Sequence, residues 1–391
     1  MESTSTGDRP VVLYLTNGSE LMRVGGNALR TAAVDEALHR CAITTTHRVR
    51  CVDEEDCAHA APAGPAATAG IGQDAAFHNA YCSVAGQRVR EVAERVRPDI
   101  VVATGLEMWR YLHVAKETTG AAAVLDLVNA DSQLAGEIWS VLRSRPDAET
   151  FGLDDGVALR RVEAAALSFV DHLWTCTRLD AAALSALHDF PIDNVTVVPN
   201  AVTSPAARPQ HSGVEQIVYL GRFGWFPNYL AAEFLIDELA PMLARSATPL
   251  PIVLAGFGPP ASLLRRRLPA AVRLLADPVT IDHLWPDSLL AVPLTLGGGS
   301  RLKILEAFAA GCPVVSTAKG IEGIDAEDGV HYLRAETAAE MTDAVSRVTA
   351  DHTLRENLTK AGFDLLNDAY TPQRLIPLVA GSLRRFTAVR R

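Results

Sequence analysis

The chain has 391 residues, of which 48% are hydrophobic and 21% are charged. A chain of this kind buries a sizeable core, so long disorder and a small disulfide-stapled scaffold are excluded. At roughly 150 residues per domain, the length indicates two or three domains. Lys and Arg total 36 against 46 Asp and Glu, which gives a net charge of −10. Because nucleic-acid binders usually carry a basic balance, we expect no nucleic-acid partner.

The cysteines and the N-terminus indicate the compartment. The six cysteines are scattered, without a Cys-x-x-Cys pair, so we expect reduced thiols in a cytoplasmic protein. The segment Met1–Thr6 lacks the charged and apolar regions of a secretory signal. No apolar run approaches the roughly 20 residues that span a bilayer. We therefore expect no membrane association, and the pattern favours no particular oligomeric state.

Short β-branched runs recur along the chain, and each is followed by an Ala- and Leu-rich pattern that is typical of a helix. Several runs are continuously apolar, as expected of strands buried on both faces of a parallel sheet. The alternation predicts βαβ units, and about five runs in each half favour two doubly wound domains over one large sheet. The expected strands are Val11–Leu15, Ile100–Ala103, Ala123–Leu127, His172–Thr175, Val195–Val198, Gln216–Leu220, Pro251–Ala255, Val272–Leu275, Leu289–Pro293 and Pro313–Ser316.

A stretch without periodicity divides the chain into two halves. Thr203–Gly213 is rich in Pro, Ser and Ala, and a new strand is expected to begin at Gln216. This composition is typical of a linker. We therefore predict a first domain at 1–202, a second domain at 203–371 and a terminal helix at 372–391 that packs back on the first domain. The irregular stretch Ala58–Gly72 is expected to form a surface loop.

The segment Leu294–Pro313 contains the pattern that is most informative about function. The glycines of Gly297–Gly299 allow a ligand close to the backbone, and Ser300 is a suitable N-cap for the helix that follows. A helix N-terminus attracts anions. Arg301 and Lys303 add positive charges in the first turn, where they oppose the helix dipole unless an anion is bound. The pattern therefore favours a diphosphate site over a bare glycine loop with a surface Lys–Glu pair.

Glu306 lies on the same helix face as Lys303, three residues away. A carboxylate offers two acceptor oxygens, which suit the paired hydroxyl groups of a ribose. The residues alone thus indicate a nucleotide site.

Four segments, in this order along the chain, resemble one known family. Together they resemble family-4-like retaining glycosyltransferases, also called glycosyl transferases group 1. The resemblance covers nearly the whole chain and implies the GT-B fold, an α/β architecture of two Rossmann-like parallel-sheet domains that face each other across a cleft. The segments are Gly25–Arg30 after the first strand, Val198–Val202 at the hinge, Leu220–Arg222 followed by Trp225, Pro227 and Asn228, and Gly297–Pro313.

The resemblance implies a metal-independent glycosyltransferase of the hexosyltransferase class, with no cofactor besides its co-substrate. It would move a sugar, with retention, from a nucleotide-diphosphate sugar to a hydroxyl or amine of an acceptor. We expect a soluble small molecule as acceptor, such as a secondary metabolite or an amino sugar. Within the matching motif, Glu306 is the second carboxylate of the pattern E-x7-E and would hold the donor ribose. Arg222 would bind the diphosphate, and Gly25 and Gly26 would contact the donor.

The chain departs from the family pattern at three places. Gly298 stands where the first carboxylate of E-x7-E is expected, so backbone N–H groups would replace it. No Lys follows Arg222 within 223–228, which leaves Arg301 and Lys303 as its candidate replacements. Val128 stands where many relatives carry a His that faces the reacting sugar, so the polar contact is expected from Asn129 or Asp131.

The acceptor is expected on the first domain, where strand ends meet the cleft. Open α/β sheets bind ligands at the carboxyl ends of their strands. Glu107 and Trp109 follow the strand Ile100–Ala103, and Arg30 closes the glycine segment after the first strand. With Asp131, these residues are the predicted acceptor-binding group.

Two other functions stay open. A relative of this fold could couple a nucleotide-activated cyclitol to an amine, as a pseudo-glycosyltransferase. Val128 and Gly298 also allow a non-catalytic protein that binds nucleotide sugars.

A competing motif, Gly256–Ala261 with Asp277 about 20 residues on, has the spacing of a dinucleotide-binding fingerprint. Its prolines, Pro259 and Pro260, remove N–H donors that this fingerprint needs, so NAD is not expected. Asp154 and Asp155 do not follow a strand, so no metal site is expected there.

Overall fold

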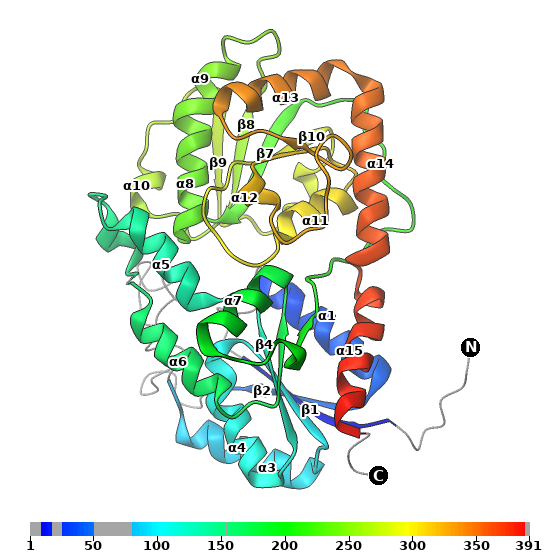
Figure 1. Ribbon diagram of the computed structural model, residues 1–391. Coiled ribbons are helices and arrows are strands. Elements are labelled where there is room, and N and C mark those ends of the chain that lie inside the picture. Colours follow the sequence, from blue (N-terminus) through cyan, green and yellow to red (C-terminus); the bar gives the residue numbers. More distant parts are fainter. Residues whose placement is uncertain (1–8, 18–25, 51–79, 154, 388–391) are drawn as a thin grey trace.

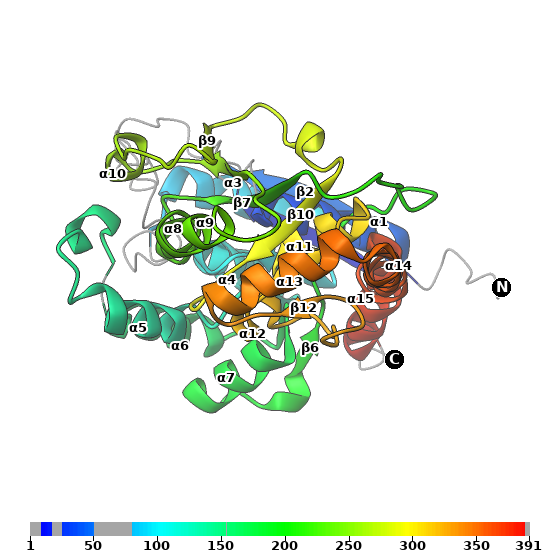
Figure 2. The same cartoon turned by 90° about the horizontal axis from the view of Figure 1, so that it is seen from above.

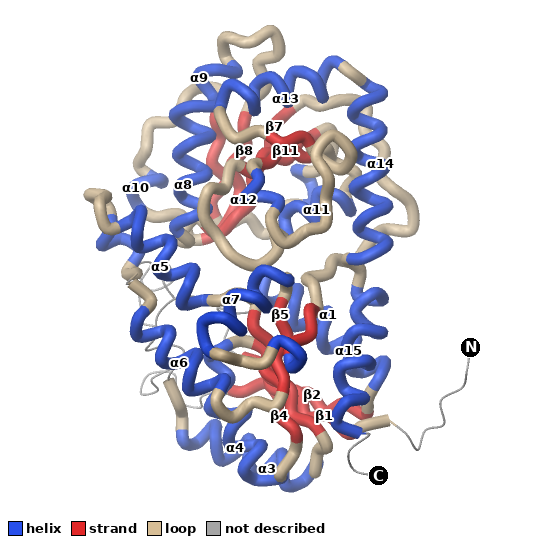
Figure 3. Tube along the Cα trace, viewed as in Figure 1, coloured by secondary structure: helices blue, strands red, loops and turns tan. Residues whose placement is uncertain are grey.

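The computed structural model describes residues 9–17, 26–50, 80–153 and 155–387. The chain forms two lobes that lie one above the other, each with strands at its centre and helices outside (Figure 1; Figure 3). Each lobe contains one six-stranded sheet, and all neighbouring strands are parallel. The prediction of two doubly wound parallel-sheet domains is confirmed. Residues 58–72, the predicted surface loop, lie outside the described residues.

Each sheet reverses its strand order once. The first sheet has the order β2-β1-β3-β4-β5-β6 and reverses between β1 and β3, while the second has the order β12-β11-β10-β7-β8-β9 and reverses between β7 and β10. The first-sheet strands are β1 (Val11–Asn17), β2 (Ile43–Val49), β3 (Ile100–Thr104), β4 (Ala122–Leu127), β5 (His172–Thr175) and β6 (Val195–Val197). The second-sheet strands are β7 (Gln216–Arg222), β8 (Ile252–Phe257), β9 (Val272–Ala276), β10 (Ser288–Val292), β11 (Val314–Ser316) and β12 (Leu333–Arg334).

Helices cover both faces of each sheet (Figure 2). Those of the first lobe are α1 (Gly26–Cys41), α3 (Ser83–Val96), η4 (Leu106–Met108), α4 (Trp109–Thr119), α5 (Asp131–Leu142), η5 (Ala148–Phe151), α6 (Val157–Leu167), α7 (Arg178–His188) and η6 (Ile192–Asn194). The following helices are α8 (Phe226–Phe234), a π-helical turn η7 (Leu235–Leu239), α9 (Ala240–Leu243), α10 (Ala261–Leu264), η8 (Asp282–Leu284), α11 (Leu302–Ala309), α12 (Ala318–Ile321), α13 (Ala338–Ala350), α14 (His352–Ala369) and α15 (Pro372–Thr387). No helix within the described ranges combines the length and apolar character that a membrane crossing requires.

About five strands are expected in each half from the sequence, and each sheet has one more. β2 is an edge strand with the sequence ITTTHRV, and most of its side chains are at least partly exposed. β12 is also an edge strand and has only two residues. Edge strands are often short or polar, because one side of the strand has no neighbour to protect. The apolar run that identifies the inner strands is therefore missing from both.

The chain crosses between the lobes twice, and the two crossings lie side by side. At the first crossing the N–H of Val202 donates to the carbonyl of Tyr370 at 2.9 Å, and Tyr370 directly follows α14. α15 then runs down the first lobe beside α1 (Figure 1). Its Leu375 and Val379 join the core of the first lobe. The domain limits at 202 and 371 stay predictions, and both fall in these crossings.

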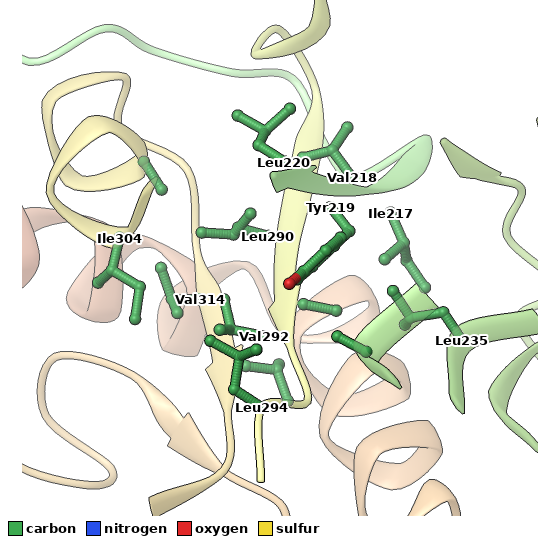
Figure 4. Close-up of a cluster of buried hydrophobic side chains, with 14 of the residues drawn as sticks. Ile217, Val218, Tyr219, Leu220, Leu235, Leu290, Val292, Leu294, Ile304 and Val314 are labelled. Atoms are coloured by element: carbon green, nitrogen blue, oxygen red, sulfur yellow. The ribbon is translucent and has the colours of Figure 1, made fainter. Parts of the chain in front are cut away.

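The core of the second lobe is built around the inner strands β7, β8, β10 and β11. Figure 4 shows the ring of Tyr219 among apolar side chains of these strands, with Leu290 and Leu235 nearby. The ring is fully buried, yet its hydroxyl needs a polar partner. That partner belongs to the site described next.

Candidate active site

The reversal between β7 and β10 is the place where an open sheet of this kind binds its ligand. Arg222 is the last residue of β7, and the segment 294–301, which we call the donor loop, joins β10 to α11. Gly297 and Gly299 in this loop have φ angles of 133° and 65°, which side chains rarely tolerate. The predicted glycine loop therefore lies at the reversal, beside the end of β7.

Ser300 is not the N-cap that the sequence predicts. Arg301 occupies the N-cap position of α11, with φ −90° and ψ 95°, and no side chain caps the helix. The Ser300 hydroxyl is buried and has no hydrogen-bond partner in the described part of the chain. Among the described residues, the N–H groups of Gly298 and Ser300 also meet no acceptor. The start of α11 thus keeps polar groups free for a ligand.

Arg301 is turned back onto the donor loop. Its side chain is buried, and Nη1 donates to the carbonyl oxygens of Gly298 and Gly299, at 3.1 Å for the latter. Nη2 donates to the carbonyl of Lys319 at 3.3 Å, while Nε has no partner within the described residues. Burial lowers the pKa of Arg301. The guanidinium therefore holds the donor loop in its conformation and adds a positive charge next to it.

Lys303 on α11 reaches β7 and α8. Its Nζ donates to the Tyr219 hydroxyl and to Oδ1 of Asn228, both at 3.0 Å, and lies 4.1 Å from the centre of the Tyr219 ring. The Tyr219 hydroxyl also donates to Asn228, at 2.7 Å. Burial, with the neighbouring charge of Arg301, lowers the pKa of Lys303 to about 7. A plain surface Lys–Glu pair, the alternative left open by the sequence, is wrong.

Asn228 is a site residue that the sequence reasoning used only as part of a motif. Its Oδ1 accepts hydrogen bonds from both Tyr219 and Lys303, and its Nδ2 donates to the carbonyl of Arg222 at 3.0 Å. The amide thus ties the end of β7 to α11. The signal in the sequence was the short spacing from Arg222 to Asn228, but nothing in that spacing shows that Lys303 arrives from another helix.

Two charges at this reversal have no counter-ion in the described part of the chain. Arg222 is partly buried, its guanidinium makes no hydrogen bond there, and burial lowers its pKa. Glu306 is partly buried, its carboxylate accepts no hydrogen bond from the described residues, and burial raises its pKa against the opposing effect of Lys303. An uncompensated charge in such a position disfavours folding. Both charges are suited to a ligand that carries the complementary groups.

The first lobe meets the donor loop through the segment that follows β4. A Cβ added to Gly299 would lie 2.7 Å from Oδ1 of Asn129 and 3.0 Å from the carbonyl of Val128. A Cβ added to Gly298 would lie 3.2 Å from the same Asn129 oxygen and from a methyl group of Leu134. The glycine that replaces the expected carboxylate therefore sits where the second lobe contacts the first. The departures from the family pattern at Gly298 and Val128 therefore lie at the same contact between the donor loop and the segment after β4.

Acidic side chains support this contact from behind. Asn129 donates to Asp131, the first residue of α5, at 3.2 Å. Burial and the neighbouring Glu163 raise the pKa of Asp131 well above its ordinary range. Asp180 in α7 accepts from the N–H of Ala130 at 3.3 Å. Burial raises the pKa of Asp180, and a hydrogen bond from the N–H of Gly299 offsets part of that rise.

A cavity of about 760 Å³ extends from the ends of β1 and β3 along α1 and β2. Asn17, Thr104, Glu107 and Val128 are among its lining residues. Glu107 is almost fully buried and accepts a hydrogen bond from Nδ2 of Asn17 at 3.3 Å. Of the predicted acceptor-binding residues, Glu107 is the one that lines this cavity.

Two other predicted acceptor residues are elsewhere. Arg30 is only 1% exposed, and its guanidinium is committed to Asp126, Val198 and Asn200, so the prediction that it binds the acceptor is wrong. Trp109 packs against Phe169, with ring centres 6.0 Å apart, and does not line the cavity. Gly25 lies outside the described residues, and Gly26 begins α1.

The dinucleotide-like motif forms a structural turn. The N–H of Gly258 donates to Asp277 at 2.9 Å, and the helix that follows, α10, has only four residues. A dinucleotide fingerprint needs a long helix whose N-terminus faces the pyrophosphate. Over the described residues, no group of three or more His, Cys, Asp or Glu is arranged to hold a metal ion.

Comparison with known proteins identifies the class. Residues 214–351 match the family model of glycosyl transferases group 1. The whole fold is similar to sucrose-phosphate synthase from Thermosynechococcus elongatus, with a TM-score of 0.64 and 15% identity over 97% of this chain and 99% of that one. It is also similar to Anabaena HepE in complex with UDP-glucose, with a TM-score of 0.63 and 13% identity over 96% of this chain and 99% of that one.

TarM is similar over a smaller part, with a TM-score of 0.57 and 13% identity over 76% of this chain and 58% of TarM. The chain therefore spans little more than half the length of TarM. A comparison with the sequences of curated proteins gives no match.

The chain has the GT-B fold, with two parallel-sheet lobes as in these structures. More narrowly, residues 214–351 match glycosyl transferases group 1, the family that the sequence motifs resemble.

Proposed function

We propose that this protein is a retaining glycosyltransferase that takes a sugar from a nucleotide-diphosphate sugar. The observation that carries the proposal is the group of charges at the β7–β10 reversal. Arg222 and Glu306 have no counter-ion among the described residues, and Lys303 donates to two neutral oxygens. Two cations and one carboxylate, set beside a glycine loop and a helix start, complement a diphosphate joined to a ribose.

The roles follow from charge. Arg222 and Lys303 would meet the diphosphate, together with the free N–H groups of Gly298 and Ser300. Arg301 would act on it through its field, since its own donors largely hold the loop. Glu306 would accept hydrogen bonds from the ribose hydroxyls. Because negative charge develops on the diphosphate as it leaves, preorganised donors here stabilise the transition state by roughly 3–4 kcal/mol each.

We further propose that these cations take the part that a divalent metal plays in other transferases. In the retaining step, the acceptor oxygen bonds to the sugar C1 on the face from which the C1–O bond to phosphate breaks. The acceptor proton passes to the departing phosphate oxygen. No carboxylate nucleophile is required by this route, unlike the paired carboxylates of retaining glycosidases. Asn129, which touches the donor loop, would orient the transferred sugar.

The acceptor pocket is proposed to be the cavity at the ends of β1 and β3. Val128 lines this cavity, and the next residue, Asn129, lies against Gly299 of the donor loop. The cavity is therefore next to the donor loop. Its polar lining, including Asn17 and Glu107, suits a hydroxylated or amino-bearing small molecule. Coupling of a nucleotide-activated cyclitol to an amine would use the same groups.

The proposal is tested by thermal shift with UDP, GDP, ADP and dTDP, because a ligand that binds only the native state raises its stability. UDP is expected first, since related structures are bound to UDP or UDP-glucose. Release of nucleoside diphosphate is then followed with a panel of nucleotide sugars and acceptors, with and without EDTA.

Nucleotide binding without turnover on any donor would favour a non-catalytic binding protein. Activity that EDTA abolishes and magnesium restores would refute the metal-free route. No binding of any nucleotide would refute the proposed function itself.

A further inference from the structure

Buried polar side chains form a line from the core of the first lobe to the donor loop. Its members are Asp126 on β4, Arg30 on α1, Asn200 at the first crossing and the carbonyl of Ser300. We propose that Asn200 is a positioning residue that, held by Arg30, fixes the Ser300 carbonyl and with it the start of α11. Its effect on catalysis rests on the proposed function, whereas its effect on the donor loop does not.

The anchor of the line is the pair of Arg30 and Asp126. The two side chains are 1% and 0% exposed, and two guanidinium nitrogens donate to the two carboxylate oxygens, with Nε at 3.0 Å. Thr104 donates to the same carboxylate at 2.9 Å and is itself bonded to Tyr14. Asp126 is thus held from both sides, which leaves the remaining nitrogen of Arg30 in a fixed position.

That remaining nitrogen sets the orientation of the Asn200 amide. Nη1 of Arg30 donates to the carbonyl of Val198 at 2.9 Å and to Oδ1 of Asn200 at 3.2 Å. A guanidinium has no acceptor, so the atom of Asn200 that faces it must be the oxygen. The Cys176 thiol also donates to this oxygen, at 3.4 Å. The NH2 group of Asn200 must therefore point the other way.

The NH2 group of Asn200 meets the donor loop. Asn200 is 3% exposed, and its Nδ2 donates to the carbonyl of Ser300 at 3.4 Å. In a trans peptide the C=O and the next N–H point in opposite directions. Holding the Ser300 carbonyl therefore fixes the direction of the Arg301 N–H at the N-cap of α11. Arg301 holds the carbonyls of Gly298 and Gly299 in the same loop, so the loop is clamped from both lobes.

A plain stabilising role explains this arrangement poorly. Replacement of a buried ion pair by well-packed apolar residues is often neutral or stabilising, so such a pair is weak support for stability. The line of buried polar groups instead fixes the orientation of the Asn200 amide and of the Ser300 carbonyl. It ends on the loop that carries the proposed diphosphate site, and it passes through the crossing between the lobes.

The experiment compares Asn200→Asp with Ser382→Ala by hydrogen exchange of the unliganded full-length protein. Asn200→Asp keeps an oxygen for Arg30 but has no NH2 for Ser300. Ser382→Ala is the matched control, because it removes a buried hydrogen bond of the same lobe, from Trp174 at 2.8 Å, far from the donor loop. We expect amides of 294–306 to exchange about fivefold to tenfold faster in Asn200→Asp alone, as loss of one hydrogen bond implies.

Equal exchange of this segment in Asn200→Asp and wild type would overturn the proposal. So would an increase spread over the whole chain, since that reports loss of global stability and not a local change of the donor loop. If Asn200→Asp does not fold, Asn200→Ser is used, because it removes the NH2 group that meets Ser300, and the same result is expected.

The second measurement is UDP affinity by calorimetry at a temperature where all variants are folded. Asn200→Asp is expected to weaken UDP about tenfold, with Ser382→Ala unchanged. A local change of exchange with unchanged UDP affinity would refute the link to donor binding. A local change in a protein whose wild type binds no nucleoside diphosphate would leave the positioning of the loop intact and refute the proposed function.

Discussion

The two lobes, whose facing sides we call the two walls, use charge in opposite ways. On the wall of the second domain, Arg222 and Glu306 meet no counter-ion among the described residues, and Lys303 rests on a ring and two neutral oxygens. On the wall of the first domain, charged groups are satisfied by partners. Arg30 is bonded to Asp126, and Glu163 accepts from Ser132 and lies 2.9 Å from Nε2 of His188.

This difference separates ligand-binding groups from scaffold. A partly buried charge without a partner costs free energy of folding, and a bound ligand can offset that cost. A buried charge whose hydrogen bonds are all made has nothing left to offer a ligand. The four predictions below test whether the walls divide in this way, beginning with the largest expected effect.

Arg30→Met should cause the largest loss of stability. It leaves Asp126 buried with no opposite charge, and breaking a buried pair by removing one partner costs about 3–5 kcal/mol. Urea unfolding measures the loss. The double variant Arg30→Met with Asp126→Leu should recover most of it, because both charges are gone. Lys360→Ala, which removes an exposed ion pair with Asp364, is the control and should leave the urea midpoint unchanged. A single variant as stable as this control would show that Arg30 is not scaffold.

Arg222→Met should behave in the opposite way. Removal of a preorganised donor to the leaving group is expected to lower kcat about 100-fold to 1,000-fold. Stability should be unchanged or slightly higher, since Arg222 makes no hydrogen bond in the described structure and burial opposes its charge. Steady-state kinetics and urea unfolding on the same preparation make the comparison. Loss of stability together with activity would place Arg222 with the scaffold residues of the other wall.

Glu306→Gln should weaken the donor rather than the chemistry. A carboxylate that accepts from two hydroxyls contributes about 1.5–3 kcal/mol through charge-assisted hydrogen bonds, so UDP affinity is expected to fall at least tenfold. A UDP analogue without the 2′ and 3′ hydroxyls provides the ligand-side control. It should bind wild type and variant equally in calorimetry. A variant that loses affinity for both ligands alike would contradict the contact with ribose.

The sequence predicted the second wall better than the first, for a physical reason. The donor loop and Arg222 both belong to segments that resemble the family. The glycines, the charged residues and the start of the helix can be identified from the residues themselves. The family match at 214–351 confirms the class that this pattern indicates. The position of Lys303 against Tyr219, in contrast, depends on packing of α11 on β7, which no spacing reports.

Arg30 illustrates what the sequence cannot distinguish. A cation after a glycine segment has the same letters whether its partner is a ligand or a buried carboxylate 96 residues away. The edge strand β2 was missed for a related reason, because its side chains need no apolar core on the open side. The contact between Asn129 and Gly299 also arises only when two separate domains meet. Sheet order and pairing of charges are long-range properties, whereas motifs are local.

The last prediction concerns the proton of Lys303. Its pKa of about 7 means that, in the free protein, the amine loses its proton as pH rises through neutrality. A bound diphosphate would favour the charged amine and raise that pKa, so binding above pH 7 takes up a proton. UDP affinity should therefore fall with rising pH, by about fivefold between pH 7 and pH 8 if the amine is fully charged in the complex.

Calorimetry in buffers of different ionisation enthalpy measures this proton uptake directly. Lys303→Arg keeps a charge at all these pH values, so it should bind UDP with a flatter pH profile and no uptake. Lys303→Met should also give a flat profile, but with the weak affinity that wild type approaches at high pH. A wild-type profile as flat as that of Lys303→Arg would mean that Lys303 does not meet the diphosphate. Arg222 and the donor loop would then bind it alone, and Lys303 would belong with the scaffold charges of the opposite wall.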